Sequence, residues 1–153
     1  MATSVVPALI DALTAAATAA LPQVFVYDSV PVTTEPGDYL MVGVSDPDDP
    51  SESEAATVTQ QQMTFGATRP RMEEGVIHMA ARSINGDSLA KVARDAVYAI
   101  QEALATAVRT TDNLGVTGVM QIGNASDLKF MQGPTAYGAQ ATLLYGIAFK
   151  ATI

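Results

Sequence analysis

The single histidine, His78, is the first residue of this chain that could carry acid–base or nucleophilic chemistry. It lies in the middle of an alternating run, Gly75 to Ile84, that predicts a strand. A Ser-His-Asp triad would have to use it, yet no serine has the glycine pattern of a nucleophile elbow around it. We therefore interpret His78 as a hydrogen-bonded surface or interface residue, and the sequence predicts no catalytic residue and no enzyme activity.

Carboxylates are plentiful, and their densest run is the segment DPDDPSESE from Asp46 to Glu54. Closely spaced acids can bind Ca²⁺, but the D-x-D-x-D-G loop with a distal glutamate is absent, and Pro47 and Pro50 stiffen the segment. Adjacent carboxylates in loops are also a weak basis for general acid–base catalysis. We predict an exposed acidic loop here, with no metal and no cofactor.

Charge is distributed unevenly along the 153 residues, which carry a net charge of −8. Residues 1–68 contain nine acids and no lysine or arginine, whereas the remainder contains seven acids and eight bases. An acidic chain of this kind has no basic surface for gripping DNA, although it could line a wall past which DNA slides. Phosphate-binding glycine loops are absent, and without tryptophan a platform for stacking single strands is not expected.

The length predicts a single domain, 1–153, large enough to bury a stable core without disulfides or a structural metal. No cysteine is present, so disulfides and thiolate metal sites are excluded. No apolar run approaches the ~20 residues of a membrane span, and the N-terminus is a poor secretion signal. These features fit a protein of a reducing compartment that does not enter a membrane.

Two helices are predicted. The first runs from Ser4, its capping residue, to Ala20, and the face opposite its apolar stripe carries alanine and threonine in place of charges. Such a face suggests cover on a second side, as by a neighbouring molecule. The second helix runs from Ser88 to Arg109, is capped by Asp87, and should lie across the apolar face of a sheet. Its predicted apolar stripe comprises Leu89, Val92, Ala93, Ala96, Val97, Ile100, Leu104, Ala107 and Val108.

The last segment, Ala136 to Ile153, alternates almost without fault, with an apolar, aromatic-rich face on every second residue. At about 3.3 Å per residue it would span roughly 55 Å, beyond the usual strand. Two interpretations stand open: the strand bends at Gly138 or Gly146 inside one domain, or one end pairs with another subunit.

Five further strands are predicted, separated by turn-rich links, and a short extension of the sheet is expected at Asp127 to Gly133. They cover Gln23–Asp28, Asp38–Ser45, Ala56–Ala67, Gly75–Ile84 and Val116–Asn124. The order is therefore α-β-β-β-β-α-β-β. Because strands follow one another without alternating helices, the fold class is α+β, a mostly antiparallel sheet packed against one long helix, with an N-terminal helix.

The order and spacing of several segments resemble the tail terminator (tail-completion) family of long-tailed bacteriophages, over nearly the whole chain. They include VGVSDPD, R-x-x-EEG-x-I across Arg71 to Ile77, SINGD before the long helix, and the closing YGAQATLLYGIAFKATI. None is a catalytic signature. The resemblance implies a structural virion protein whose hexameric ring caps the tail tube, stops its polymerisation and offers the head a docking surface.

The same resemblance implies the partners and the location. They are other copies of the chain in a homo-oligomer, the tail tube protein, and the head-side connector (stopper) protein. Genomic DNA would pass through the lumen without sequence-specific binding, at the head–tail junction of the virion, after assembly in the host cytoplasm. A closed ring requires a heterologous interface between unlike surfaces.

Candidate interface residues follow from the charged segment before the strand at Gly75, read as a hairpin tip that touches a neighbouring subunit. They are Arg69, Arg71, Glu73 and Glu74. Acids of the exposed loop are predicted to face the lumen or a ring end: Asp46, Asp48 and Asp49. Two alternatives remain open, a head-closure or stopper connector of the neck, and, in another class, a small cytosolic enzyme or ligand-binding domain.

Overall fold

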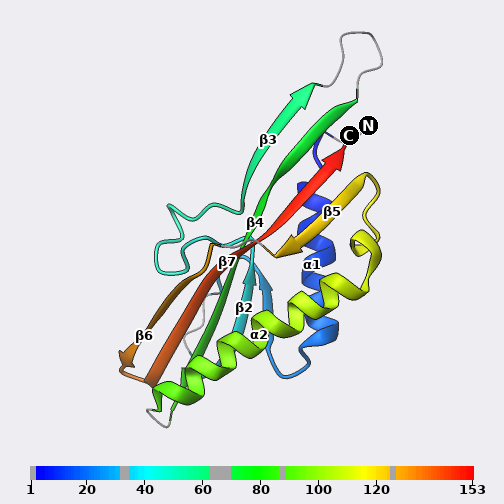
Figure 1. Ribbon diagram of the computed structural model, residues 1–153. Coiled ribbons are helices and arrows are strands. Elements are labelled where there is room, and N and C mark those ends of the chain that lie inside the picture. The colour runs from blue at the N-terminus through cyan, green and yellow to red at the C-terminus, as the bar shows by residue number, and fades with distance from the viewer. Residues whose placement is uncertain (1–2, 32–34, 63–69, 87–88, 125–126) are drawn as a thin grey trace.

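The computed structural model describes residues 3–31, 35–62, 70–86, 89–124 and 127–153, which form two helices on one side of a seven-stranded sheet (Figure 1). The predicted α+β class is confirmed. The elements are α1 (Val6–Ala20), β1 (Phe25–Asp28), β2 (Gly37–Val42), β3 (Ala56–Gln62), β4 (Arg71–Asn85), α2 (Ala90–Thr110), the 3-10 turn η1 (Asp112–Gly115), β5 (Val119–Asn124), β6 (Lys129–Thr135) and β7 (Gly138–Thr152).

Two long antiparallel strands, β4 and β7, form the middle of the sheet, and each is 15 residues long. Their pairing runs from Met72 opposite Thr152 to Asn85 opposite Ala139. On its other edge, each of these two long strands pairs with two shorter strands that follow one another along its length. Strands β3 and β2 pair with β4, strands β5 and β6 pair with β7, and β1 adds to β2 in the one parallel pairing of the described strands.

The alternation of the last segment is confirmed in β7. Alternate residues from Ala139 to Ala151 are buried, and they point toward the helices because side chains of a strand alternate between its two faces. Tyr137, predicted on the same face, is 54% exposed because it lies in the turn between β6 and β7. With β4 on one edge and β5 and β6 on the other, β7 is paired along its length within one molecule. Its length therefore requires no second copy.

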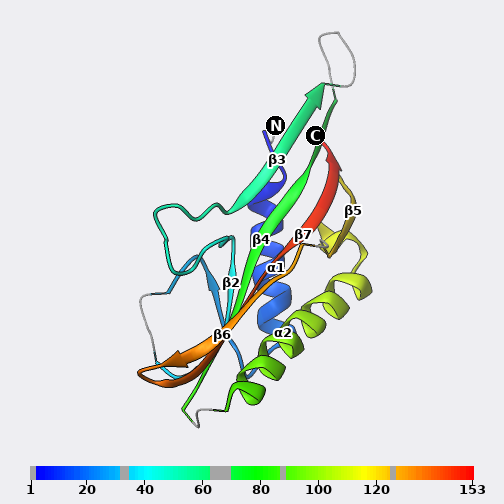
Figure 2. The ribbon, with the colours of Figure 1, turned by 60° about the vertical axis from the view of Figure 1, so that its left-hand side comes forward.

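Both helices cover the same face of the sheet, as the two views show (Figures 1 and 2). Leu9 and Leu13 of α1 share one core with Val97 and Leu104 of α2 and with Ile147 of β7. Most of the predicted stripe of α2 is thereby confirmed, but Leu89 and Val92 are 57% and 49% exposed. Leu89 precedes the first helical residue, so the prediction extended the apolar face beyond the part of the helix that reaches the sheet.

Several element boundaries differ from those predicted. Helix α1 begins at Val6, with Val5 in the capping position, and the Ser4 hydroxyl accepts a hydrogen bond from the Val6 N–H at 3.1 Å. Strand β4 begins at Arg71, four residues before the predicted start, and 129–135 form a separate strand instead of a short extension. The predicted helix cap Asp87 and the end of the third predicted strand, 63–67, lie outside the described residues.

Candidate interaction surfaces

The charged segment before Gly75 lies inside strand β4, where the sequence analysis placed a hairpin tip. Its residues pair with β3 on one edge, Glu73 opposite Gln60 and Arg71 opposite Gln62, and with the end of β7 on the other. Arg71 and Ile153 also exchange both backbone hydrogen bonds, at 3.1 and 2.9 Å. Arg69 lies outside the described residues. The interface role of this segment stays a prediction, but its residues belong to a strand and not to a turn.

Glu73 is fully buried, which sets it apart from its neighbour Glu74. Its Oε1 accepts hydrogen bonds from the Ser4 hydroxyl at 3.0 Å and from the Val5 N–H at 2.8 Å, and its Oε2 accepts one from the Gln60 amide at 2.5 Å. The first N–H groups of a helix have no partner within the helix and carry partial positive charge. The Glu73 carboxylate of β4 therefore accepts hydrogen bonds from the N-terminal end of α1 and from β3, and so connects these three elements.

The Gln60 amide also donates to the Thr3 carbonyl oxygen at 2.8 Å, so β3 is bound to the chain leading into α1. This explains part of the polar centre of β3, which contains three consecutive glutamines. An exposed glutamine opposite a buried glutamate on the neighbouring strand supplies the donor that the carboxylate needs. Sequence reasoning missed the pair because the residues that Glu73 binds lie 13 and 68 or more positions away.

Glu74 points to the opposite face, where its carboxylate lies 3.6 Å from the Lys150 ammonium of β7. Both side chains are substantially exposed, 58% and 43%, so the pair contributes little to stability. Of the predicted interface residues in the described chain, Glu74 and the half-buried Arg71 remain accessible to a partner. Glu73 is occupied within the molecule.

The acidic segment forms an exposed loop between β2 and β3, as predicted. The loop is ordered by its own side chains: Asp46 Oδ1 accepts the Asp48 N–H at 3.0 Å, and Asp49 Oδ1 accepts the Ser51 hydroxyl at 2.7 Å. Asp48 also pairs with Arg82 of β4 at 2.8 Å, which fastens the loop to the sheet face away from the helices. That ion pair neutralises a single acid of the five, so the loop keeps a strongly negative surface.

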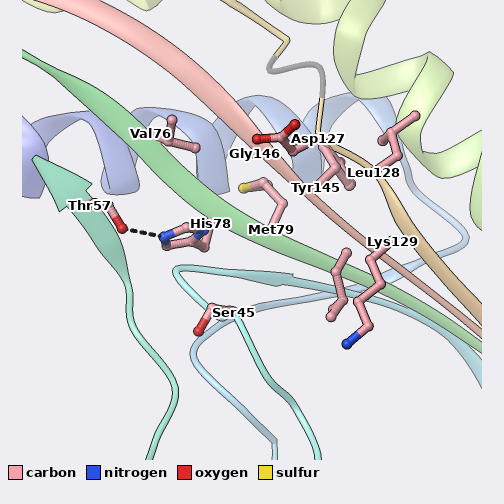
Figure 3. A pocket seen from close by; sticks show the side chains of 11 residues that line it. Ser45, Thr57, Val76, His78, Met79, Asp127, Leu128, Lys129, Tyr145 and Gly146 are labelled. Carbon is pink, nitrogen blue, oxygen red and sulfur yellow. Dashed lines mark hydrogen bonds between the residues drawn. The ribbon is translucent and has the colours of Figure 1, made fainter.

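A cavity of about 270 Å³ contains the chain's histidine (Figure 3). His78 Nε2 lies 2.8 Å from the Thr57 hydroxyl across the β3–β4 pair, as expected for a hydrogen-bonded strand histidine. Ser45 and Asp127 line the same cavity, but the Ser45 hydroxyl accepts the Glu54 N–H at 2.7 Å, and neither residue is hydrogen-bonded to His78 in the described chain. Serine, histidine and aspartate thus come near one another here without the relay of hydrogen bonds that a nucleophilic triad needs.

Other chemistry finds no support in the described residues. Within the ranges that the structure covers, no three histidine, cysteine or carboxylate side chains group closely enough to hold a metal ion. Over the same ranges, neither helix is long and apolar enough to cross a membrane.

Burial raises the pKa of the Tyr145 hydroxyl above its usual range, and that hydroxyl has no hydrogen-bond partner among the described residues. Its place in the core marks a packing residue and not an acid or base.

Comparison with known proteins finds a similar fold among solved structures and no match by sequence. No family model matches the sequence, and no curated protein matches it. The structure is similar to a chain in the solved structure described as "Virion of native gene transfer agent (GTA) particle". The match covers 99% of this chain and 100% of that chain, with a TM-score of 0.59 and 14% sequence identity. The likeness at this identity establishes a shared fold over the full length of both chains.

Proposed function

We propose that this chain is a structural subunit of a phage-like particle: a tail terminator whose ring caps the tail tube, stops its polymerisation and provides the surface on which the head docks. The observation that carries the proposal is the full-length likeness of the fold to a chain of a gene transfer agent virion. The order of segments that resembles the tail terminator family supports it independently, because that order is a property of the sequence and does not depend on the fold comparison.

The surface formed by the described residues is consistent with a binding role. Within the described residues, the cavity around His78 contains no connected set of catalytic groups, because neither Ser45 nor Asp127 is hydrogen-bonded to the histidine. In a ring of six copies each subunit presents one surface to the next and a different surface to the previous one. The proposed partners are further copies of this chain, a tail tube protein and a head-side connector, with DNA passing through the lumen unbound.

Tube growth tests the proposal directly. Purified tail tube protein is allowed to polymerise with and without this chain, and tube lengths are measured by negative-stain electron microscopy. A terminator should shorten the tubes in proportion to its amount and appear as extra density at one end. Tubes that grow equally long and stay bare at both ends contradict the proposal. Capture of the head-side connector alone, without the tube protein, would point to a stopper connector instead.

The acidic loop has a separate place in this proposal, at the lumen or at an end of the ring. The variant Asp46→Asn/Asp48→Asn/Asp49→Asn removes three negative charges, and a lumen lined with neutral amides should repel DNA less. We expect the variant ring to retain double-stranded DNA at low salt when the unchanged ring does not, measured by mobility shift. Equal behaviour of the two rings would remove these acids from the path of the DNA.

The strand segment at Arg71 and Glu74 is the proposed contact with a neighbouring subunit. Alanine at Arg69 and Arg71 should weaken self-association, whereas alanine at Glu102, on the exposed side of α2, serves as a charge-removal control. The mass distribution from sedimentation velocity is the measurement. Unchanged assembly of the arginine variant would remove this segment from the interface.

A further inference from the structure

The described part of the sheet has four edge strands, and they differ in how they are protected against pairing with another chain. Natural sheets protect their edges with charged side chains, prolines or very short strands. Strand β6 contains Lys129 and Pro134, and β1 is four residues long and ends at Asp28. Strands β3, ATVTQQQ, and β5, VMQIGN, contain no charged residue and no proline. A bulge between Val119 and Gln121 interrupts β5, so the regular part of its edge is Gln121–Asn124. Two of the four edges are therefore open.

The register identifies which backbone groups of β3 face outward. The His78 N–H donates to the Ala55 carbonyl at 3.0 Å, and the register places these two residues opposite each other. Because hydrogen-bonded and non-hydrogen-bonded pairs alternate along an antiparallel ladder, alternate residues after Ala55 point their backbone groups away from β4. These outward residues are Ala56, Val58, Gln60 and Gln62. In the described chain, none of their backbone groups has a hydrogen-bond partner on that side.

The two open edges lie on opposite sides of the same half of the sheet, where the strand order is β3-β4-β7-β5 (Figures 1 and 2). All three pairings in this half are antiparallel, so β5 runs opposite to β3. The strands are also of similar length, seven and six residues. A copy rotated about an axis along the strands keeps every strand direction. Its β3 would therefore meet the β5 of the first copy in antiparallel orientation.

We propose that the open edge of β3 in one copy pairs with the open edge of β5 in the next copy, extending one antiparallel sheet from subunit to subunit. This inference rests on the proposed ring and specifies its interface. The contact joins two different edges, so it is heterologous, as closure by rotation requires. It would pair the outward backbone groups of β3 and cover the Met120 side chain of β5, which is 51% exposed.

The β3 edge can be blocked without breaking the bonds inside the molecule. Proline lacks a backbone N–H, and it is tolerated on an edge strand where that N–H faces solvent. Val58→Pro/Gln62→Pro removes two outward donors and none that points to β4. We expect the circular dichroism spectrum to be unchanged and self-association to weaken at least about tenfold, because two hydrogen bonds and the close approach of the strands are lost.

The matched control is Val58→Ala/Gln62→Ala, which truncates the same side chains but retains both N–H groups. Its self-association should equal that of the unchanged chain, measured by sedimentation equilibrium and native mass spectrometry. If the double proline variant does not fold, Gln62→Pro alone repeats the test at an exposed position. Proline variants that assemble as well as the alanine control overturn the inference.

Cross-linking through introduced cysteines decides which edge is the partner. The linkage is specific because the chain contains no cysteine of its own. Thr59→Cys in β3 and Gln121→Cys in β5 are prepared separately, mixed and treated with a short thiol-to-thiol linker. Dimers containing one chain of each variant, identified by mass, support the pairing. Dimers formed by Thr59→Cys alone indicate that two β3 strands meet and overturn it.

Failure of this inference and failure of the proposed function give different results. A chain that caps tubes while its proline variant still assembles would retain the function and lose the edge pairing. A chain that stays monomeric at its highest soluble concentration also overturns the edge pairing, because that contact needs only a second copy. In either case the tube-length assay decides the terminator role separately.

Discussion

The carboxylate of Glu73 is the polar group whose loss should destabilise this fold most, because it is fully buried and accepts three hydrogen bonds. A hydrogen bond to a charged group contributes about 1.5–3 kcal/mol, and an anion at a helix N-terminus contributes roughly 0.3–2 kcal/mol more. Glutamine keeps the shape and one acceptor oxygen, but its amide group faces the donor of Gln60. We expect Glu73→Gln to lower the free energy of unfolding by about 2 kcal/mol.

Alanine at the same position should lower the free energy of unfolding by about 4 kcal/mol, because it leaves the Val5 N–H and the Ser4 hydroxyl without the acceptor. Urea titration followed by far-ultraviolet circular dichroism measures both changes. In thermal unfolding, a loss of about 2 kcal/mol corresponds to a fall in Tm of roughly 4–8 °C for a chain of this size. Amide exchange at Val5 should accelerate in both variants, since its N–H loses the charged partner.

Glu74→Gln is the matched control, because it removes the same charge at the next position. The Glu74 side chain is 58% exposed and its ion pair with Lys150 is long, so its free energy of unfolding should change by less than about 0.5 kcal/mol. Should Glu73→Gln prove as stable as this control, with unchanged exchange at Val5, the carboxylate does not hold the helix in the way the geometry indicates.

Further predictions concern the core and the close contact between strands. Tyr145→Phe should raise the free energy of unfolding by about 1 kcal/mol, because it removes a buried hydroxyl without a hydrogen-bond partner in the described chain. Burial also raises the Tyr145 pKa, so the unfolded chain loses this proton first, and stability should fall above about pH 10 in the unchanged protein but less in the phenylalanine variant, measured by urea titration across pH. Gly75→Ala should lower the free energy of unfolding by about 1–3 kcal/mol, because the added Cβ would lie 2.2 Å from the Thr57 carbonyl oxygen. Gly123→Ala, whose Cβ meets nothing within 4 Å, is its control, and equal losses in the two glycine variants would refute the contact.

Prediction from the sequence succeeded where a pattern recurs within a short segment. The alternation of β7 extends over a 15-residue strand and the apolar stripe of α2 over a 21-residue helix, and the structure confirms the elements and most of their buried faces. It was less accurate at boundaries. Leu89 and Val92 continued the helical pattern, yet Leu89 precedes the first residue of α2, and Val92 is 49% exposed although the adjacent Ala93 is buried in the core.

The interaction surfaces were harder to predict, because exposure depends on which strands become neighbours. Arg71, Glu73 and Glu74 looked alike in sequence, a charged run after a proline. Folding assigned them to the two faces of one strand, burying Glu73 against α1 and leaving Glu74 in solvent. Period-2 alternation would have separated their faces only if the strand had been predicted to begin at Arg71.

What the sequence determined by itself is the set of local elements, because hydrophobic periodicity is a property of adjacent residues. It also determined the acidity of the first 68 residues and the absence of cysteine. Only the tertiary structure decided that β7 is paired on both edges, that Glu73 holds the N-terminus of α1, and that β3 and β5 are left as open edges. These features depend on contacts between residues far apart in the chain, and such contacts form only when the strands and helices pack together.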